Sequence, residues 1–248
     1  MTTPNQPQKS DAVLGGNSPA QAAVMGGIQG IKIALVHAQA FPQQQELLRS
    51  ALQYGQEGIA IIMQYLCHSD KNLRNFAYEL LRERQESHVK QALALFTASG
   101  IYYRDLQQLL RRQQWEAANF WTQQTVGELC HAPQRVTKSH ILNLPCGDLL
   151  LIDRLWREAS HDRFGFTVQA RIWQQCTQLL WDQNRALSLF GDRVGWRVHN
   201  LLFNTYHWKR YEELNFSLRA PRGHLPWING IFLVKAINDR LLACQGKA

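Results

Sequence analysis

The chain has 248 residues, of which 45% are hydrophobic, so it is long enough to build one large core or two smaller ones. Lys and Arg outnumber Asp and Glu by 27 to 19, and the formal charge of +8 favours anionic partners such as nucleic acid, acidic lipid or a carboxylated small molecule. No apolar stretch approaches the roughly 20 residues of a membrane-spanning helix, and no arginine precedes Arg49, which argues against a membrane span, a secretory signal and an Arg-rich transit peptide.

Five cysteines are spread along the chain, at Cys67, Cys130, Cys146, Cys176 and Cys244. Their number is odd, and their spacing shows neither a CxxC pair nor the histidine spacing of a zinc finger. We therefore expect reduced, mostly buried thiols rather than a disulfide or metal framework, in keeping with a reducing compartment.

The first segment, residues 1–17, is polar and interrupted by Pro and Gly. It cannot bury enough apolar surface to offset the entropy of ordering, so we predict a disordered arm. Ser18 and Pro19 then have the pattern of an N-cap and a first-turn proline, which predicts that a helix begins there.

Apolar residues recur at helical spacing between Gln45 and Phe96. Ser69 or Asp70 is the predicted cap of one helix in this region, and Ser87 is the predicted cap of the next. Residues 18–96 are therefore predicted to form a helical bundle, whose helix pairs resemble HEAT-like repeats.

A glycine at position 100 follows a helical stretch and predicts a boundary, so residues 98–248 are predicted to be a second domain. Helical patterns cover residues 106–129 and 149–160, and the Pro- and Gly-containing segment 131–148 between them is expected to be a loop. Because no segment shows a sustained period of two, the predicted fold class is all-α, or mainly α.

The stretch from Leu155 to Trp173, LWREASHDRFGFTVQARIW, combines two phenylalanines around one glycine with three arginines. Gly165 allows an irregular turn in which Phe164 and Phe166 lie on different sides, so that at least one ring faces a cleft. The alternative is that both rings belong to the core.

Two later segments share this composition: GDRVGWR at 191–197 and YEELNFSLRAPRGHLPW at 211–227. The second is a proline-flanked loop, and long irregular loops on helical scaffolds often carry function. It is predicted to form a pocket whose rim is Arg219, Arg222 and His224 and whose floor is Phe216, Leu218 and Leu225. The alternative is a solvated loop held by its prolines.

Taken in this order, the three segments resemble the diagnostic motifs of the genomes-uncoupled-four family, and the resemblance runs from about residue 102 to residue 227. These are porphyrin-binding proteins that stimulate magnesium chelatase in chlorophyll synthesis, and cyanobacterial members place a helical bundle before the porphyrin-binding domain. The resemblance implies a mostly helical, cupped-hand domain in which an apolar palm holds a flat tetrapyrrole. Basic residues meet its propionates, for which Arg supplies bidentate contacts.

The resemblance assigns the porphyrin site motif by motif. The palm candidates are Leu155, Phe164, Val168 and Phe216, and the propionate candidates are Arg163, Arg219 and Arg222. The remaining motif residues of the predicted site are Phe166, His224 and Leu225. By contrast, the expected scaffold residues are Asp153, Trp156 and Trp196.

The implied ligand is protoporphyrin IX or Mg-protoporphyrin IX, and the implied partner is magnesium chelatase, through its large porphyrin-binding subunit. A metal-free porphyrin needs no axial ligand and a bound magnesium ion can keep a water, so no protein metal ligand, catalytic residue or catalytic cofactor is expected. The implied location is cytoplasmic, and the basic surface permits peripheral contact with the thylakoid membrane.

The chain also departs from the family pattern. Where the family usually reads W-x-x-A-D-x-E-T, this chain has WEAANFWT, which places Asn119 and Trp121 at the two acidic positions, as expected surface changes. These departures leave open a divergent paralogue that senses a tetrapyrrole or binds a protein without stimulating the chelatase. An enzyme is not expected, because adjacent Cys–His pairs diverge on a helix and His224 has no partner in sequence. A nucleic-acid binder is not expected either, because the arginines lie in separate loops rather than along one helix.

Overall fold

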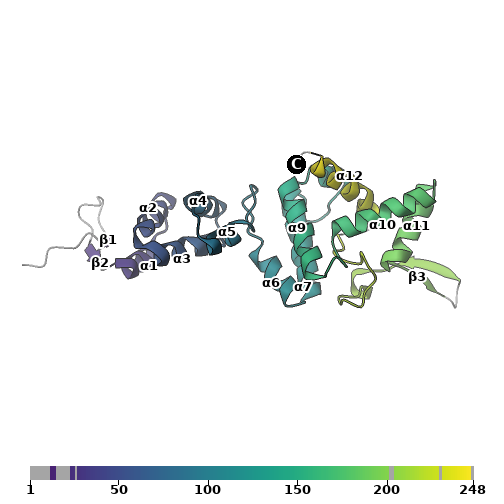
Figure 1. Cartoon of the computed structure of the whole chain (residues 1–248), viewed down its shortest axis with the longest axis horizontal. Helices are drawn as coiled ribbons and strands as arrows, with labels where there is room; N and C mark the ends of the chain where they lie inside the picture. Colours follow the sequence, from purple (N-terminus) through teal and green to yellow (C-terminus); the bar gives the residue numbers. More distant parts are fainter. Residues whose placement is uncertain (1–11, 15–22, 26, 201–203, 229–230, 247–248) are drawn as a thin grey trace, which may run out of the picture. The chain divides into compact units, whose positions relative to one another are not determined.

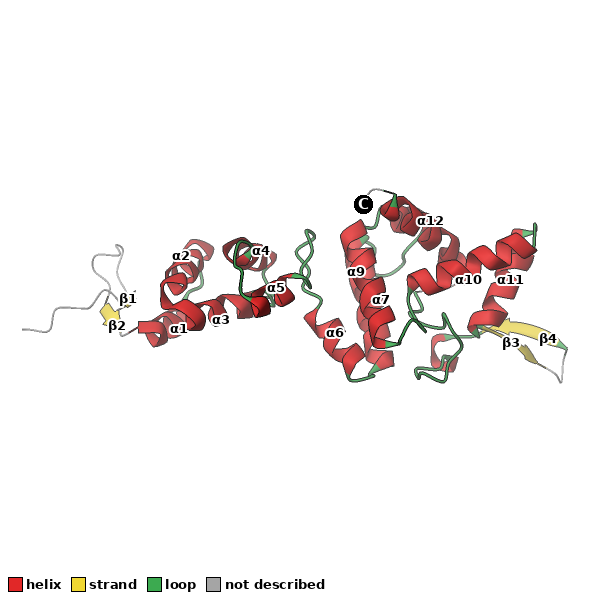
Figure 2. Cartoon of the chain, in the orientation of Figure 1, coloured by secondary structure: helices red, strands yellow, loops and turns green. Residues whose placement is uncertain are grey.

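A computed structural model describes residues 12–14, 23–25, 27–200, 204–228 and 231–246 of the chain (Figure 1). Its contacts divide the chain into two compact units, Met1–Tyr102 and Tyr103–Ala248. Both units are built mainly from helices, and the strands of the described residues form two short antiparallel hairpins (Figure 2). The predicted mainly α fold class is confirmed.

The first unit begins, in its described residues, with strand β1 (Ala12–Leu14) paired with strand β2 (Ala23–Met25). Its α-helices are α1 (Gly27–His37), α2 (Phe41–Ala51), α3 (Gly55–Tyr65), α4 (Lys71–Leu81) and α5 (Ser87–Leu93), and the short 3-10 helix η2 (Leu52–Tyr54) joins α2 to α3. Each α-helix packs against the next one along the chain.

The start of this unit differs from the sequence prediction. The helix expected from Ser18 is wrong for Ala23–Met25, which are strand, and α1 begins only at Gly27 with a φ of 63°. Two consecutive glycines at 26 and 27 explain the late start, because glycine loses the most backbone entropy in a helix. Of the predicted disordered arm, residues 1–11 and 15–17 lie outside the described residues, as does Ser18, and the remaining three form β1.

The helices of the first unit surround one apolar core. Its fully buried side chains come from the apolar positions of the helical pattern and include Leu48, Ile59, Ile62, Leu66, Leu73 and Leu81. The predicted cap at Asp70 is confirmed, because its side chain accepts a hydrogen bond from the Asn72 N–H at 2.7 Å. The predicted cap at Ser87 is wrong by one residue: Glu86 occupies the cap position and Ser87 is the first residue of α5.

The second unit carries the three motif segments. Its α-helices are α6 (Arg104–Arg111), α7 (Trp115–Leu129), α8 (Lys138–Leu142), α9 (Cys146–Ala159), α10 (Phe166–Leu179), α11 (Gln183–Val194) and α12 (Val234–Gln245). Its strands are β3 (Arg197–Asn200) and β4 (Thr205–Trp208), and its 3-10 helices are η3 (Tyr211–Glu213) and η4 (Ile231–Leu233). Helix α12 packs against α8, α9 and α10, and α10 packs against α11.

A short pair of strands and one short helix were not expected from the sequence. Strands β3 and β4 pair antiparallel with Arg197 opposite Trp208, but four residues are too few for an alternating pattern to stand out. The expected loop at 131–148 contains the five-residue helix α8, which Thr137 caps by accepting from the His140 N–H at 3.4 Å. Short elements of this kind depend on their caps and packing more than on periodicity.

Aromatic side chains build the core of the second unit. Trp115, Trp156 and Phe164 pack on one another with ring centroids 5.5 to 6.4 Å apart. Phe190 packs edge-on against both Trp173 and Trp196, at 6.1 and 5.5 Å. Such rings bury large apolar areas, so motif residues provide much of the stability of this unit.

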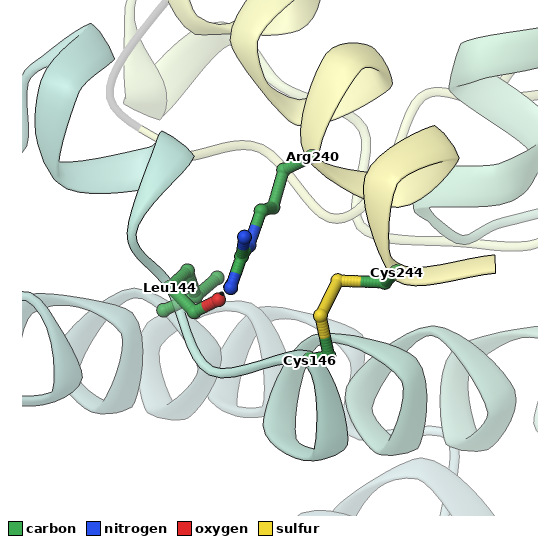
Figure 3. Close-up of a disulfide and its surroundings, with 4 residues drawn as sticks. All are labelled: Leu144, Cys146, Arg240 and Cys244. Carbon is green, nitrogen blue, oxygen red and sulfur yellow. Dashed lines mark hydrogen bonds between the residues drawn. A yellow bond between two sulfur atoms is a disulfide. The ribbon is translucent and has the colours of Figure 1, made fainter. Parts of the chain in front are cut away.

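The prediction that all cysteines are reduced is wrong. Cys146, the first residue of α9, forms a disulfide with Cys244 near the end of α12, with a Cα–Cα distance of 5.4 Å (Figure 3). The sequence separation of 98 residues gives no spacing signal, and only the packing of α12 on α9 brings the two side chains together. The other three cysteines, Cys67, Cys130 and Cys176, are thiols.

Candidate functional site

The turn around Gly165 and the final loop lie against each other, although 57 residues separate Arg163 from Ala220. The Arg163 Nε donates to the Ala220 carbonyl at 2.8 Å. The Gly165 N–H donates to the Leu225 carbonyl at 2.9 Å, and the Gly223 N–H donates to the Arg163 carbonyl at 2.9 Å. Two of the motif segments therefore form one hydrogen-bonded structure.

Glycine is required where these segments meet. Gly165 has a φ of 121°, and an added Cβ would lie 2.7 Å from the Arg157 Cγ. Gly223 has a φ of 77°, in a region that other residues rarely adopt. The buried Gln169 closes the junction, because its Nε2 donates to the carbonyls of Gly223 and Pro226 at 3.0 and 2.8 Å.

His224 is fully buried and joins the final loop to the end of α11. Its Nδ1 lies 2.6 Å from the Val194 carbonyl, and its Nε2 accepts from the Asn215 N–H at 3.0 Å. These two contacts require a neutral ring that donates from Nδ1, and burial lowers the pKa of His224. The Trp196 Nε1 donates to the His224 carbonyl at 2.8 Å, so both side chains hold backbone in place.

The other expected scaffold residues have similar contacts. The Asp153 carboxylate accepts from the Thr167 N–H at 2.7 Å and from the Thr167 hydroxyl at 2.5 Å, so α9 caps the start of α10. Burial raises the pKa of Asp153 against the lowering effect of these hydrogen bonds. The Trp156 Nε1 donates to the Thr122 hydroxyl at 3.0 Å inside the core.

Most of the predicted porphyrin site is core. Six of its ten residues are at most 3% exposed: Leu155, Phe164, Phe166, Val168, His224 and Leu225. Phe164 illustrates the reason, because its ring packs edge-on against Trp115 and Trp156. These six side chains are therefore part of the core, and for Phe164 and Phe166 the structure agrees with the alternative that both rings are core.

The three predicted propionate ligands differ in exposure. Arg163 is half-buried and uses its Nε on the Ala220 carbonyl. Arg219 and Arg222 are exposed on the final loop, three and six positions after Phe216 in the chain. Of the three, Arg219 and Arg222 are therefore the exposed guanidinium groups.

An open groove of about 600 Å³ lies between the start of α7 and the segment around η3, and we call it the α7 groove. Its lining residues are Gln114, Trp115, Glu116, Ala117, Phe120, Tyr211 and Phe216. Of the ten predicted site residues, Phe216 is in this lining. The sequence reasoning missed Trp115, Phe120 and Tyr211, although Phe120 lies within the WEAANFWT departure from the family pattern and is 56% exposed.

Tyr211 gives the α7 groove its most unusual polar group. Its ring packs against Phe216 and Trp227 with centroids 5.2 and 5.9 Å apart. Its hydroxyl oxygen is buried and makes no hydrogen bond within the described residues. Burial raises the pKa of Tyr211, the nearby Asn119 amide opposes this shift, and Glu116 adds to it. A buried hydroxyl without a partner costs free energy, so this position is strained relative to a fully hydrogen-bonded one.

A comparison with known families decides the identity of the second unit. Residues 97–242 match the family model described as GUN4-like. The chain belongs to the GUN4-like family. Membership supports a general role as a porphyrin-binding regulator. Among the described residues of this GUN4-like chain, no group of three or more His, Cys, Asp or Glu side chains is placed to hold a metal ion. No described helix is long and apolar enough to cross a membrane.

Two curated proteins and two solved structures are among those similar to this GUN4-like protein. This chain is 30% identical over 165 residues to a Ycf53-like protein of Synechocystis, and the match covers 64% of this chain. It covers 65% of the Synechocystis protein, so the chain spans just under two thirds of the length of that relative. It is 29% identical over 175 residues to a ycf53 protein of Porphyra purpurea, covering 65% of this chain and 68% of the other. The structure of GUN4 from Chlamydomonas reinhardtii matches with a TM-score of 0.47 and 28% identity, over 64% of this chain and 96% of that one. The ligand-free structure of Arabidopsis thaliana GUN4 matches with a TM-score of 0.45 and 27% identity, over 55% and 90%.

The departure at position 119 is not a surface change in this GUN4-like protein. Asn119 is fully buried; its Oδ1 accepts from the Trp227 N–H at 2.7 Å and its Nδ2 donates to the Trp227 carbonyl at 3.3 Å. Gln123 donates to the same carbonyl at 2.8 Å. An amide can both accept and donate, whereas an ionised acid only accepts, so Asn119 is matched to this backbone contact. Trp121 is half-buried and packs edge-on against Tyr103 at 5.4 Å.

Proposed function

We propose that this GUN4-like protein binds a tetrapyrrole, protoporphyrin IX or its magnesium complex, in the α7 groove. The observation that carries the proposal is the lining of the groove, where Trp115, Phe120, Tyr211 and Phe216 surround about 600 Å³. This volume is in the range of small-molecule sites, and aromatic side chains match a wide apolar disc. The buried Tyr211 hydroxyl offers the ligand a hydrogen bond that the described residues leave unused.

The exposed cations of the final loop support an anionic ligand at this site. Arg219 and Arg222 follow Phe216 in the same loop and are exposed, so we expect them to meet the carboxylates of a disc that binds against Phe216. Arg222→Ala is expected to weaken binding by about 1 to 3 kcal/mol, the range for a hydrogen bond to a charged group, and added salt should reduce the difference. Arg185→Ala, which removes an exposed arginine from α11, is the matched control and should bind as wild type.

The proposed biological role is stimulation of magnesium chelatase, through its large porphyrin-binding subunit, and it rests on family membership. The second candidate is a paralogue that binds the tetrapyrrole without stimulating the chelatase. Asn119 and Trp121 favour it, because they place a backbone clamp and a packed ring where the family motif usually has two acids. Magnesium insertion by the chelatase subunits at low magnesium, with and without this protein, separates the two. Faster insertion supports the regulator, and tight binding with an unchanged rate supports the paralogue.

Titration with deuteroporphyrin and its magnesium complex, followed by tryptophan fluorescence, tests binding. Trp115 lines the α7 groove, so bound porphyrin should quench its emission. Phe216→Ala should weaken binding about 5- to 150-fold, which corresponds to the loss of about 1 to 3 kcal/mol of aromatic contact. Phe232→Ala removes a ring that is 68% exposed outside the groove and is the control. Equal affinities for wild type, Phe216→Ala and Phe232→Ala would refute the proposed site.

A further inference from the structure

Helix α12 packs on α10, where the Gln174 Nε2 donates to the Asn238 Oδ1 at 2.9 Å, and its last turn is joined to the α9 region at one further place. There, Cys244 is joined to Cys146 of α9, and the Arg240 Nε donates to the Leu144 carbonyl just before α9, at 2.7 Å (Figure 3). Leu241, 2% exposed, is the buried apolar side chain between these two contacts along the chain.

Packing on the α10 side of this turn is incomplete. A groove of about 190 Å³ lies between α10 and α12, and its lining is Thr167, Ala170, Arg171, Gln174, Asn238, Leu241, Leu242 and Gln245. Leu242, in the last turn of α12, is 51% exposed. Among residues 242–246 only Cys244 is buried, so the attachment of the last turn depends on the disulfide.

The two sulfur atoms differ in how easily a reductant reaches them. Cys244 is 3% exposed, whereas Cys146 is half-buried at the first position of α9. We therefore expect a thiolate from solution to attack at Cys146, the more exposed of the two residues. The partial positive charge at a helix N-terminus also stabilises a thiolate formed at Cys146 in the second step of reduction.

We propose that the Cys146–Cys244 disulfide is a thiol-sensitive switch that docks the last turn of α12 when oxidised and releases it when reduced by a dithiol. One thiolate of the dithiol attacks the Cys146 sulfur, the S–S bond breaks, and its electron pair leaves on the Cys244 sulfur, which takes a proton. The second thiolate of the dithiol then attacks the mixed disulfide and releases the Cys146 thiolate, which is protonated in turn. The dithiol is oxidised by two electrons and the protein gains two thiols. This switch is independent of the proposed porphyrin binding.

Hydrogen exchange on the full-length chain tests the switch. In protein reduced with dithiothreitol, amides in the last two turns of α12 should exchange at least tenfold faster than in oxidised protein, whereas amides of α11 should not change. Reduction should also lower the Tm of the second unit by roughly 6 to 12 °C, because the disulfide closes a long loop. The Cys146→Ser, Cys244→Ser double variant should exchange fast with or without dithiothreitol.

Three results would overturn the proposal. They are equal α12 exchange in oxidised and reduced wild type, an effect of dithiothreitol on the double variant, and five titratable thiols in unreduced, denatured protein. The order of attack has its own test in the single variants. In Cys244→Ser, Cys146 should form a mixed disulfide with oxidised glutathione at least tenfold faster than Cys244 does in Cys146→Ser, as mapped by peptide mass spectrometry. Equal or reversed rates would refute attack at Cys146.

Discussion

Replacing Asn119 by alanine should weaken the contact between the final loop and α7. The substitution removes the acceptor of the Trp227 N–H at 2.7 Å and one of the two donors to the Trp227 carbonyl, at 3.3 Å. The Trp227 N–H is left without a partner in a partly buried place, which costs about 1 to 3 kcal/mol. Loss of the longer hydrogen bond, from the Asn119 Nδ2 to the Trp227 carbonyl, adds about 0.5 to 1 kcal/mol. We expect the free energy of unfolding of the second unit to fall by about 1.5 to 4 kcal/mol.

Urea denaturation followed by tryptophan fluorescence measures this change. Gln123→Ala is the control, because it removes one donor at 2.8 Å and leaves the Trp227 carbonyl with the Asn119 Nδ2. It should cost only about 0.5 to 1.5 kcal/mol. Since Trp227 packs on Tyr211, Asn119→Ala should also weaken porphyrin binding. A loss below about 0.5 kcal/mol for Asn119→Ala, or one no larger than for Gln123→Ala, would refute the reasoning.

Three further predictions concern the motifs and the domain boundary. Burial lowers the pKa of His224 below 6.5, so the stability that neutral His224 contributes is present above pH 6.5 and is lost as the pH falls through the folded-state pKa. The Tm of the wild type should therefore fall more between pH 7.5 and 5.5 than the Tm of His224→Gln. Equal slopes of Tm against pH would contradict this. Gly223→Ala should lower the free energy of unfolding in urea by about 1 to 3 kcal/mol, because φ is 77° and the added Cβ would lie 2.8 Å from the Ile172 Cδ1. Gly147→Ala is the control and should cause no such loss, because its Cβ meets nothing within 4 Å. Similar losses in the two variants would refute the argument. Residues 98–248 alone should fold and bind deuteroporphyrin; helical circular dichroism without binding would show that the first unit contributes to the site.

The local sequence pattern was sufficient to predict a feature when that feature depends on a single helix or turn. The helical periodicity, the Asp70 cap and the glycine-containing turn at Gly165 all follow from neighbours within a few positions. The motif order was also sufficient to predict the family, because long ordered motifs are visible without coordinates. The Ser18 start failed because Ala23–Met25 pair as a strand, which propensity alone does not show.

The sequence could not determine which of the motif phenylalanines are buried in the core and which line a groove. Phe164 and Phe216 have the same side chain and both lie in motifs, yet Phe164 is enclosed by Trp115 and Trp156, whereas Phe216 lines the α7 groove. The local sequence does not predict this difference, because it depends on how α7, which is distant from both phenylalanines in the chain, packs against each segment.

The sequence by itself determined the mainly α class, the family and the supply of aromatic and basic side chains in three motifs. Only the tertiary structure decided that Asn119 is buried against Trp227, that Tyr211 lines the α7 groove and has a buried hydroxyl, and that Cys146 meets Cys244. The physical reason is range: periodicity and capping act over one or two helical turns, whereas burial and covalent pairing depend on contacts between residues separated by 98 positions, as in the disulfide, or by 108 positions, as in the Asn119 clamp.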